Sequence, residues 1–253
     1  MTDPRRVAMP LLLAIALAGC GSPPASVTHA SSGLHAIEAG SGQLPFVVLH
    51  GYGSSAGEWL PFTHTIVLPA NRRFVMPEAP ERTTPPDGPT TGRAWWRLGL
   101  DGYRRPGDGL PDLSRSNPPG LAASSTRVRA LLGELATAGG YPRDRQMLAG
   151  FSQGGMVAAN IAFTTDEPLE ALVLLSTTVV DEPAWRAGMS RRRGLRVFIS
   201  HGRRDDMLPF DAADRLQGSM RDAGLRVTWF PFDGGHDMPA EVVVALNAFL
   251  AQP

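Results

Sequence analysis

Gly150-Phe151-Ser152-Gln153-Gly154-Gly155 is the stretch of this sequence that decides the fold. It joins a short apolar run, residues 146–150, to a helical stretch over residues 154–163, so the serine lies in a sharp strand–turn–helix connection. A Cβ atom on either flanking glycine would collide with the neighbouring strand or helix, and the turn strains the serine backbone. The motif therefore predicts a Ser152 hydroxyl exposed above a sheet, at a helix start whose amides favour negative charge. The alternative is a glycine-rich helix start with an ordinary serine.

Strand-like and helix-like segments alternate on both sides of this stretch. Runs typical of strands occupy residues 34–38, 46–50, 73–76, 146–150, 171–175, 197–200 and 226–232. Val128, Leu131, Leu132 and Leu135 have the spacing of an amphipathic helix that ends at Gly139-Gly140. Further helices are expected around Leu216 and Met220 and over residues 241–251. This alternation predicts an α/β fold with a mostly parallel central sheet and helices on both faces.

A serine hydroxyl needs an adjacent base before it becomes a useful nucleophile, and six histidines are available. His236 is the best candidate, because the loop Gly234-Gly235-His236-Asp237 lies between the last predicted strand and the last predicted helix. His50 and His201 each end a strand, and for them we expect hydrogen bonds that orient loops. Less support exists for the remaining three, which are His29, His35 and His64.

The base in turn needs a carboxylate that holds it in one tautomer. The loop after residues 197–200 contains Asp205 and Asp206, and spacing alone does not choose between them. An oxyanion formed at Ser152 would need two backbone N–H donors. We expect them from Gln153, which follows the serine, and from Tyr52 in the loop His50-Gly51-Tyr52-Gly53. The alternative for this loop is a plain glycine turn.

Together these segments resemble the phospholipase/carboxylesterase family, the branch of the α/β-hydrolases that includes acyl-protein thioesterases. The resemblance rests on residues 49–53, on residues 150–155, on the segment from His201-Gly202 through Asp205 to Leu208-Pro209, and on Gly235-His236. It covers roughly residue 46 to the C-terminus and selects Asp205 over Asp206. It implies the α/β-hydrolase fold and a Ser152–His236–Asp205 triad that cleaves carboxylic esters through an acyl-enzyme. The stretches 98–120 and 177–193 depart from the family pattern, and whether residues 98–120 form a lid is open.

Residues 93–96, Arg-Ala-Trp-Trp, also resemble a family segment near the acyl site. Trp95 and Trp96 are therefore either part of a substrate pocket or ordinary core residues. The substrate class is likewise open within the triad chemistry, because thioesters, lysophospholipids and peptides use the same three groups. A different class of function is a non-catalytic surface-binding lipoprotein on a hydrolase fold.

The chain has 253 residues and one cysteine, which excludes an intramolecular disulfide and a cysteine-based metal site. Arg5 and Arg6 precede an apolar run over residues 7–18, which is typical of a secretory signal and short for a membrane-spanning helix. The run ends Leu17-Ala18-Gly19-Cys20, which resembles the lipobox of bacterial lipoproteins. We therefore expect a signal peptide over residues 1–19, a lipidated Cys20 on a flexible tether over residues 20–33, and a hydrolase domain over residues 34–253.

The composition and the motifs also predict which partners the protein has. The 24 basic and 24 acidic residues cancel, which argues against a general nucleic-acid binder. We expect a small-molecule ester as substrate, no metal or other cofactor, and a membrane reached through the lipid on Cys20. The location would be the cell envelope, with the outer membrane favoured in a Gram-negative host. The sequence makes no prediction of the oligomeric state.

Overall fold

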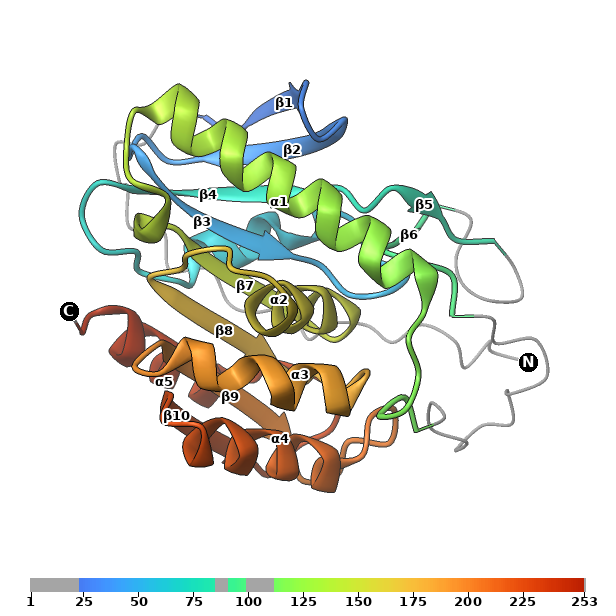
Figure 1. Ribbon diagram of the computed structural model, residues 1–253. Coiled ribbons are helices and arrows are strands. Elements are labelled where there is room, and N and C mark those ends of the chain that lie inside the picture. Colours follow the sequence, from blue (N-terminus) through green and yellow to red (C-terminus); the bar gives the residue numbers. More distant parts are fainter. Residues whose placement is uncertain (1–22, 85–90, 99–111, 253) are drawn as a thin grey trace, which may run out of the picture.

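The computed structural model describes residues 23–84, 91–98 and 112–252, and Figure 1 shows a twisted central sheet with helices packed against it. The sheet contains strands β1 (Ala25–His29), β2 (Leu34–Ala39), β3 (Leu44–Leu49), β4 (Arg72–Pro77), β7 (Met147–Phe151), β8 (Ala171–Leu175), β9 (Arg196–Gly202) and β10 (Arg226–Phe232). The α-helices are α1 (Pro119–Gly139), α2 (Gln153–Thr164), α3 (Glu182–Met189), α4 (Phe210–Asp222) and α5 (Ala240–Leu250). Short elements are the 3-10 helices η1 (Gly57–His64), η2 (Arg143–Arg145) and η3 (Ser190–Arg192), and a two-stranded ribbon of β5 (Glu81–Arg82) and β6 (Arg93–Ala94).

The strands are ordered β1-β2-β4-β3-β7-β8-β9-β10 across the sheet. The pairs β1–β2 and β2–β4 are antiparallel, whereas every pair from β4 to β10 is parallel. Parallel neighbours require crossover connections, which the helices supply. The α/β fold with a mostly parallel sheet, expected from the alternation of segments, is confirmed, and its strand order fits the α/β-hydrolase fold that the family resemblance implies.

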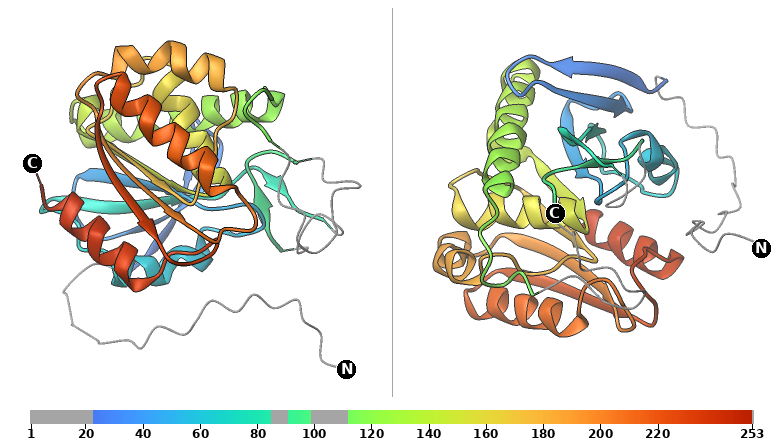
Figure 2. Two further views of the ribbon diagram at one scale, coloured as in Figure 1. Left: turned by 90° about the horizontal axis from the view of Figure 1, so that it is seen from below. Right: turned by 90° about the vertical axis from the view of Figure 1, so that its right-hand side faces the viewer.

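Alternate residues of the central strands pack into two separate cores, one on each face of the sheet. On β3, Val47 and Leu49 join the core beneath α1, α2, α3 and α4, whereas Phe46 and Val48 join the core beneath η1 and α5. The left view of Figure 2 shows these two layers on opposite sides of the sheet. Burial on both faces explains why the strand sequences are continuously apolar and do not alternate with polar residues.

Most strands lie where the sequence predicts them, and β8 and β10 have the predicted bounds. The expected tether over residues 20–33 is wrong in part, because Ala25–His29 forms β1 and pairs along its whole length with β2. The β-branched Val27 and Thr28 suit a strand, and His29 at its end is buried between Glu38 and Glu134. The folded domain therefore begins before residue 34. The expected signal peptide and Cys20 lie outside the described residues.

The segment 177–193, which departs from the family pattern, contains a helix that the sequence analysis does not predict. Asp181 begins α3, and its carboxylate accepts a hydrogen bond from the Ala184 N–H. Trp185 is buried on this helix, and its Nε1–H donates to Asn160 Oδ1 on α2 at 3.1 Å. Of the stretch 98–120, only residue 98 and residues 112–120 belong to the described part of the chain, so its role as a lid stays open.

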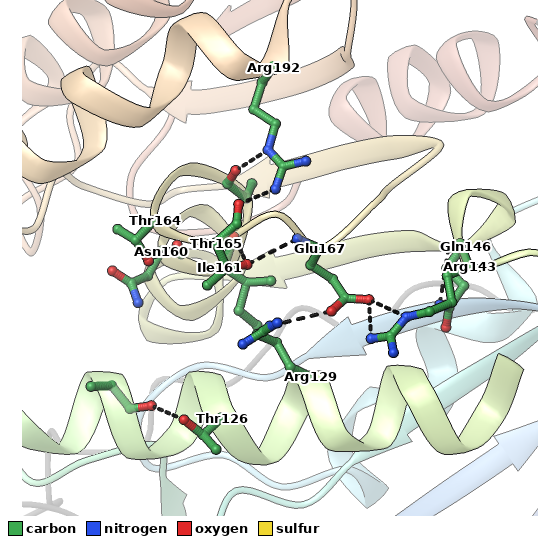
Figure 3. A network of polar contacts seen from close by, with 12 residues as sticks. Thr126, Arg129, Arg143, Gln146, Asn160, Ile161, Thr164, Thr165, Glu167 and Arg192 are labelled. Atoms are coloured by element: carbon green, nitrogen blue, oxygen red, sulfur yellow. Dashed lines mark hydrogen bonds and ion pairs between the residues drawn. The ribbon is translucent and has the colours of Figure 1, made fainter. Parts of the chain in front are cut away.

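Polar contacts tie the end of α2 to the middle of α1 and to its neighbouring segments (Figure 3). Glu167, in the loop after α2, is buried and lies between Arg129 of α1, at 3.3 Å, and Arg143, whose Nε is 3.0 Å from its carboxylate. Arg192 donates from Nε to the Ala162 carbonyl at 2.6 Å and from a second nitrogen to the Thr165 carbonyl, both at the end of α2. These contacts fix α2, whose N-cap is Ser152.

Candidate active site

The predicted functional residues gather at one edge of the sheet. Because β3, β7, β8, β9 and β10 are parallel, their carboxyl ends lie at that edge. His50 follows β3, Ser152 follows β7, Asp205 follows β9 and His236 follows β10. Loops at the carboxyl end of a parallel sheet are where α/β proteins bind ligands.

Ser152 has the strained backbone that its motif predicts, with φ 52° and ψ −119° at the junction of β7 and α2. A non-glycine residue in this region stores of order 1–3 kcal/mol of strain, so the surroundings must hold it there. Its N–H donates to the Leu175 carbonyl at 2.9 Å, and the Thr177 hydroxyl donates to its carbonyl at 3.0 Å.

The glycines of the motif are required by close backbone approaches. A Cβ on Gly150 would lie 2.3 Å from the backbone of Gly154, and a Cβ on Gly154 would lie 2.2 Å from the Leu49 carbonyl oxygen of β3. Neither position has room for a side chain, as the motif implies. The tight packing of α2 on β3 and β7 is what presents Ser152 at the sheet edge.

Asp205 and His236 form a hydrogen-bonded pair. His236 Nδ1–H donates to Asp205 Oδ2 at 2.7 Å, and the Asp205 carboxylate is fully buried while the His236 side chain is 17% exposed. Burial raises the pKa of Asp205, but hydrogen bonds from His201, His236 and the Leu208 N–H outweigh it and hold that pKa well below its ordinary range. Asp205 is therefore an ionised acceptor near neutral pH. Asp206 is exposed.

His236 lies beside the serine turn. Its ring packs on that of Phe151, the residue before Ser152, with 4.9 Å between centroids. The loop that carries it is held closely against the Asp205 loop, because the Arg203 and Arg204 N–H groups donate to the Phe232 and Gly234 carbonyls at 2.8 and 2.9 Å. Because Nδ1 is bonded to Asp205, Nε2 is the ring nitrogen that could act as a base.

His50 orients the loop of the predicted oxyanion donor. Its Nε2 accepts from the Ala79 N–H at 3.1 Å, so Nδ1 carries the proton and donates to the Gly51 carbonyl at 2.8 Å. The Gly51 carbonyl and the Tyr52 N–H belong to one planar trans peptide and point in opposite directions. The Gly51 position lies against the turn, since a Cβ there would be 3.4 Å from Ser152 Cβ.

Burial lowers the pKa of His50, in keeping with a neutral ring that accepts at one nitrogen and donates at the other. The loop is also tied at its far side, where the Gly53 N–H donates to the Arg93 carbonyl at 2.8 Å and the Arg93 N–H donates to the Ser54 carbonyl at 2.8 Å. His50 and His201 thus both make the loop-orienting hydrogen bonds expected of them.

Trp95 and Trp96 are buried in the core between α1 and the sheet. The Gln153 side chain joins both, since its Oε1 accepts from the Trp95 N–H at 2.9 Å and its Nε2 donates to the Trp96 carbonyl at 2.8 Å. Trp95 Nε1–H donates to the His50 carbonyl at 2.9 Å. The two tryptophans also line a cavity of about 420 Å³ with residues of the α1 start, and neither Ser152 nor His236 lines it. Their contacts favour the core interpretation over the substrate pocket.

Two polar residues after β8 were missed by sequence reasoning. Ser176 and Thr177 are fully buried, and the Ser176 hydroxyl donates to the Asp237 carbonyl at 3.1 Å while that of Thr177 bonds Ser152. They link the serine turn to the His236 loop. The signal was available, because polar residues directly after a buried parallel strand must lie at the same edge as those after its neighbours.

No group of three or more His, Cys, Asp and Glu side chains is placed to hold a metal ion within residues 23–84, 91–98 and 112–252. Among the helices of this same part of the chain, none combines the length and the apolar character needed to cross a membrane.

Comparison with known proteins identifies the family of this chain. The sequence model of the phospholipase/carboxylesterase family matches residues 37–252. An acyl-protein thioesterase 1 of Cryptococcus neoformans is 25% identical over 171 residues, which is 67% of this chain and 69% of the relative. The crystal structure of esterase PE8 superposes with a TM-score of 0.66 at 24% identity, over 90% of this chain and 96% of that one. A carboxylesterase from Mesorhizobium loti gives a TM-score of 0.70 at 18% identity, over 90% and 99%.

Proposed function

The chain belongs to the phospholipase/carboxylesterase family and is a carboxylic ester hydrolase, and we propose that it acts through a Ser152–His236–Asp205 triad and an acyl-enzyme. The observation that carries this proposal is the buried Asp205–His236 hydrogen bond of 2.7 Å beside the strained turn at Ser152. Three groups follow three parallel strands here: a serine on a strained turn, a histidine and an ionised carboxylate. A serine hydrolase needs these three groups for acyl transfer.

In the proposed mechanism, Ser152 Oγ attacks the ester carbonyl carbon while its proton passes to His236 Nε2. The N–H groups of Tyr52 and Gln153 stabilise the oxyanion, and the imidazolium returns its proton to the departing alkoxide, which leaves as the alcohol. Water then attacks the acyl-enzyme, with His236 again taking the proton, and releases the acid and Ser152. Asp205 stays ionised and stabilises the charged ring.

The experiment is hydrolysis of short p-nitrophenyl esters by the purified protein, combined with labelling by a fluorophosphonate probe. Wild-type protein should turn over the ester and be labelled at Ser152, and Ser152→Ala should lose both. An active, unlabelled protein or an active Ser152→Ala variant would contradict the triad. Absence of labelling and of turnover would favour the alternative, a non-catalytic surface-binding lipoprotein.

Thioester cleavage is the second candidate, because one relative is an acyl-protein thioesterase 1. The triad treats both carbonyls alike, so a panel of esters, thioesters, lysophospholipids and peptides with matched acyl groups decides between the substrate classes. A kcat/KM at least tenfold higher for the thioester than for its matched oxygen ester would make thioesters the substrate class.

We also propose that the enzyme is exported and anchored in the cell envelope through a lipid on Cys20. The support is the apolar run that ends Leu17-Ala18-Gly19-Cys20 after two arginines. With β1 beginning at Ala25, four residues separate the cysteine from the sheet, and they span at most about 14 Å when extended. Cys20→Ser should move the protein from the membrane to the aqueous fraction of cells with esterase activity intact; a membrane-bound variant would contradict the anchor.

A further inference from the structure

Asp205 accepts three hydrogen bonds, and a second histidine lies close to the oxygen that His236 contacts. Oδ1 accepts from the Met207 and Leu208 N–H groups at 2.9 and 2.8 Å. Oδ2 accepts from His236 Nδ1 at 2.7 Å and lies 3.1 Å from His201 Nε2. His201 sits at the end of β9 and is fully buried.

The neighbours of His201 determine which nitrogen carries its proton. Nε2 faces two acceptors, Asp205 Oδ2 and the Leu208 carbonyl at 2.9 Å, so Nε2 is the donor. Nδ1 is buried without a hydrogen-bond partner in the described part of the chain, so a second proton there would have no acceptor. Beside it on β10 is Pro231, and on α4 the ring of Phe210 stands edge-on at 6.2 Å with the Arg203 guanidinium over it. Asp205 is the charged group in hydrogen-bond contact with the ring.

The unpartnered Nδ1 of His201 lowers the stability of the fold. A buried polar atom left without a partner costs about 1–3 kcal/mol, and an apolar side chain at the end of β9 would avoid that cost. Besides the Leu208 carbonyl, the polar contact of His201 Nε2 is with the carboxylate that holds His236. The backbone bonds to Oδ1 already hold the carboxylate in place, so the contact of His201 changes how the charge on Oδ2 is shared.

We propose that His201 is a positioning residue that divides Asp205 Oδ2 between two imidazoles and thereby weakens the hold of Asp205 on protonated His236. This inference rests on the proposed triad. With the His201 donor removed, the whole charge of Oδ2 acts on His236, which favours the imidazolium. The acid limb of the kcat/KM profile should then move to higher pH by about one pH unit, the scale of one hydrogen bond to a charged group.

The test compares three substitutions in the full chain. His201→Leu removes the donor, His201→Gln keeps an amide N–H at the place of Nε2, and His201→Asn keeps a polar side chain too short to reach Asp205. Ester hydrolysis followed in a pH-stat gives kcat/KM against pH, and thermal melting reports folding. We expect the acid limb to shift to higher pH in the Leu and Asn variants and to return to the wild-type position in the Gln variant.

If the acid limb lies at the same pH in the wild type, the Gln variant and the Asn variant, the proposal is wrong. The Gln and Asn variants decide this even when the Leu variant does not fold. A purely structural role would lower the melting temperature and leave the limb in place. The low-field proton resonance of His236 Nδ1–H is a second readout that needs no turnover, and it should move downfield when the His201 donor is lost. Failure of the proposed function would instead abolish turnover and labelling of the wild-type protein itself.

Discussion

At the scale of single residues, the structure distinguishes two adjacent aspartates that spacing cannot separate. The Asp205 carboxylate is buried and bonded to His236, whereas Asp206 is exposed. Because donors hold the pKa of Asp205 well below its ordinary range, it stays ionised through the neutral range and supports the charged form of His236.

Asp205→Asn and Asp206→Asn form a matched pair for this assignment. We expect Asp205→Asn to lower kcat by about 10⁴-fold, because an amide in place of the carboxylate neither stabilises the imidazolium nor selects its tautomer. Asp206→Asn should leave kcat and KM unchanged. The measurement is steady-state hydrolysis of a p-nitrophenyl ester, with circular dichroism as the control for folding; equal losses in the two variants would count against Asp205 as the orienting group.

At the scale of elements, replacing a helix glycine by alanine should have opposite effects on stability in α2 and α4. At Gly154 on α2 a Cβ would meet the Leu49 and His50 carbonyl oxygens at 2.2 and 2.6 Å, whereas at Gly218 on α4 nothing lies within 4 Å.

Gly154→Ala should therefore destabilise the fold by about 1–3 kcal/mol or more, since α2 must shift from β3. Gly218→Ala should stabilise it by about 0.5–1 kcal/mol, since it removes an unfavourable helix glycine. Urea unfolding of both variants tests the signs; a destabilising Gly218→Ala would refute this account of α4.

The elements that the sequence predicts are those that bury apolar residues in a regular pattern. The β8 and β10 runs and the Ser152 turn are local signals, because the side chains that define them are neighbours in sequence. By contrast, β1 depends on partners far along the chain, since Glu134 of α1 accepts from the Ala30 and Ser31 N–H groups. The β-branched Val27 and Thr28 are a local strand signal too weak to distinguish this segment from a tether.

In the candidate site, too, some residues are identified by local sequence signals and others only by contacts in the structure. Its serine and histidine could be located from motifs, and a choice of carboxylate needed the family resemblance. The links that Ser176 and Thr177 make required three-dimensional contacts, because Ser176 reaches Asp237 and Thr177 reaches Ser152 across separate strand ends. The contact of His201 with Asp205 is close in sequence, but its geometry is visible only in the structure.

At the scale of the whole molecule, one ionic cluster joins the first hairpin to the rest of the domain. His29 of β1 lies 3.2 Å from Glu38 of β2 and 3.4 Å from Glu134 of α1, and Arg73 of β4 donates to Glu38 at 2.8 Å. The contact with the Glu38 carboxylate raises the pKa of His29, although burial opposes it. The same contact lowers the pKa of Glu38.

These two shifts set the pH range in which the cluster stabilises the fold. A raised histidine pKa contributes stability in full below its unfolded value, about 6.5, and loses it as pH rises through the folded value. A lowered glutamate pKa contributes in full above about 4.3 and loses it as pH falls. The cluster should therefore contribute most between about pH 4.5 and 6.5 and progressively less toward pH 9.

His29→Gln should therefore cost more stability at pH 6 than at pH 9, because only the protonated ring forms charged bonds with both glutamates. A hydrogen bond to a charged group contributes about 1.5–3 kcal/mol, which sets the scale of the loss at pH 6. Urea unfolding of wild type and variant at the two pH values measures it. The matched histidine substitution outside this cluster is His35→Gln, on the exposed side of β2, where the ring is bonded to Thr28. A His29→Gln penalty that is equal at pH 6 and pH 9 would mean that His29 holds β1 through packing and not through charge.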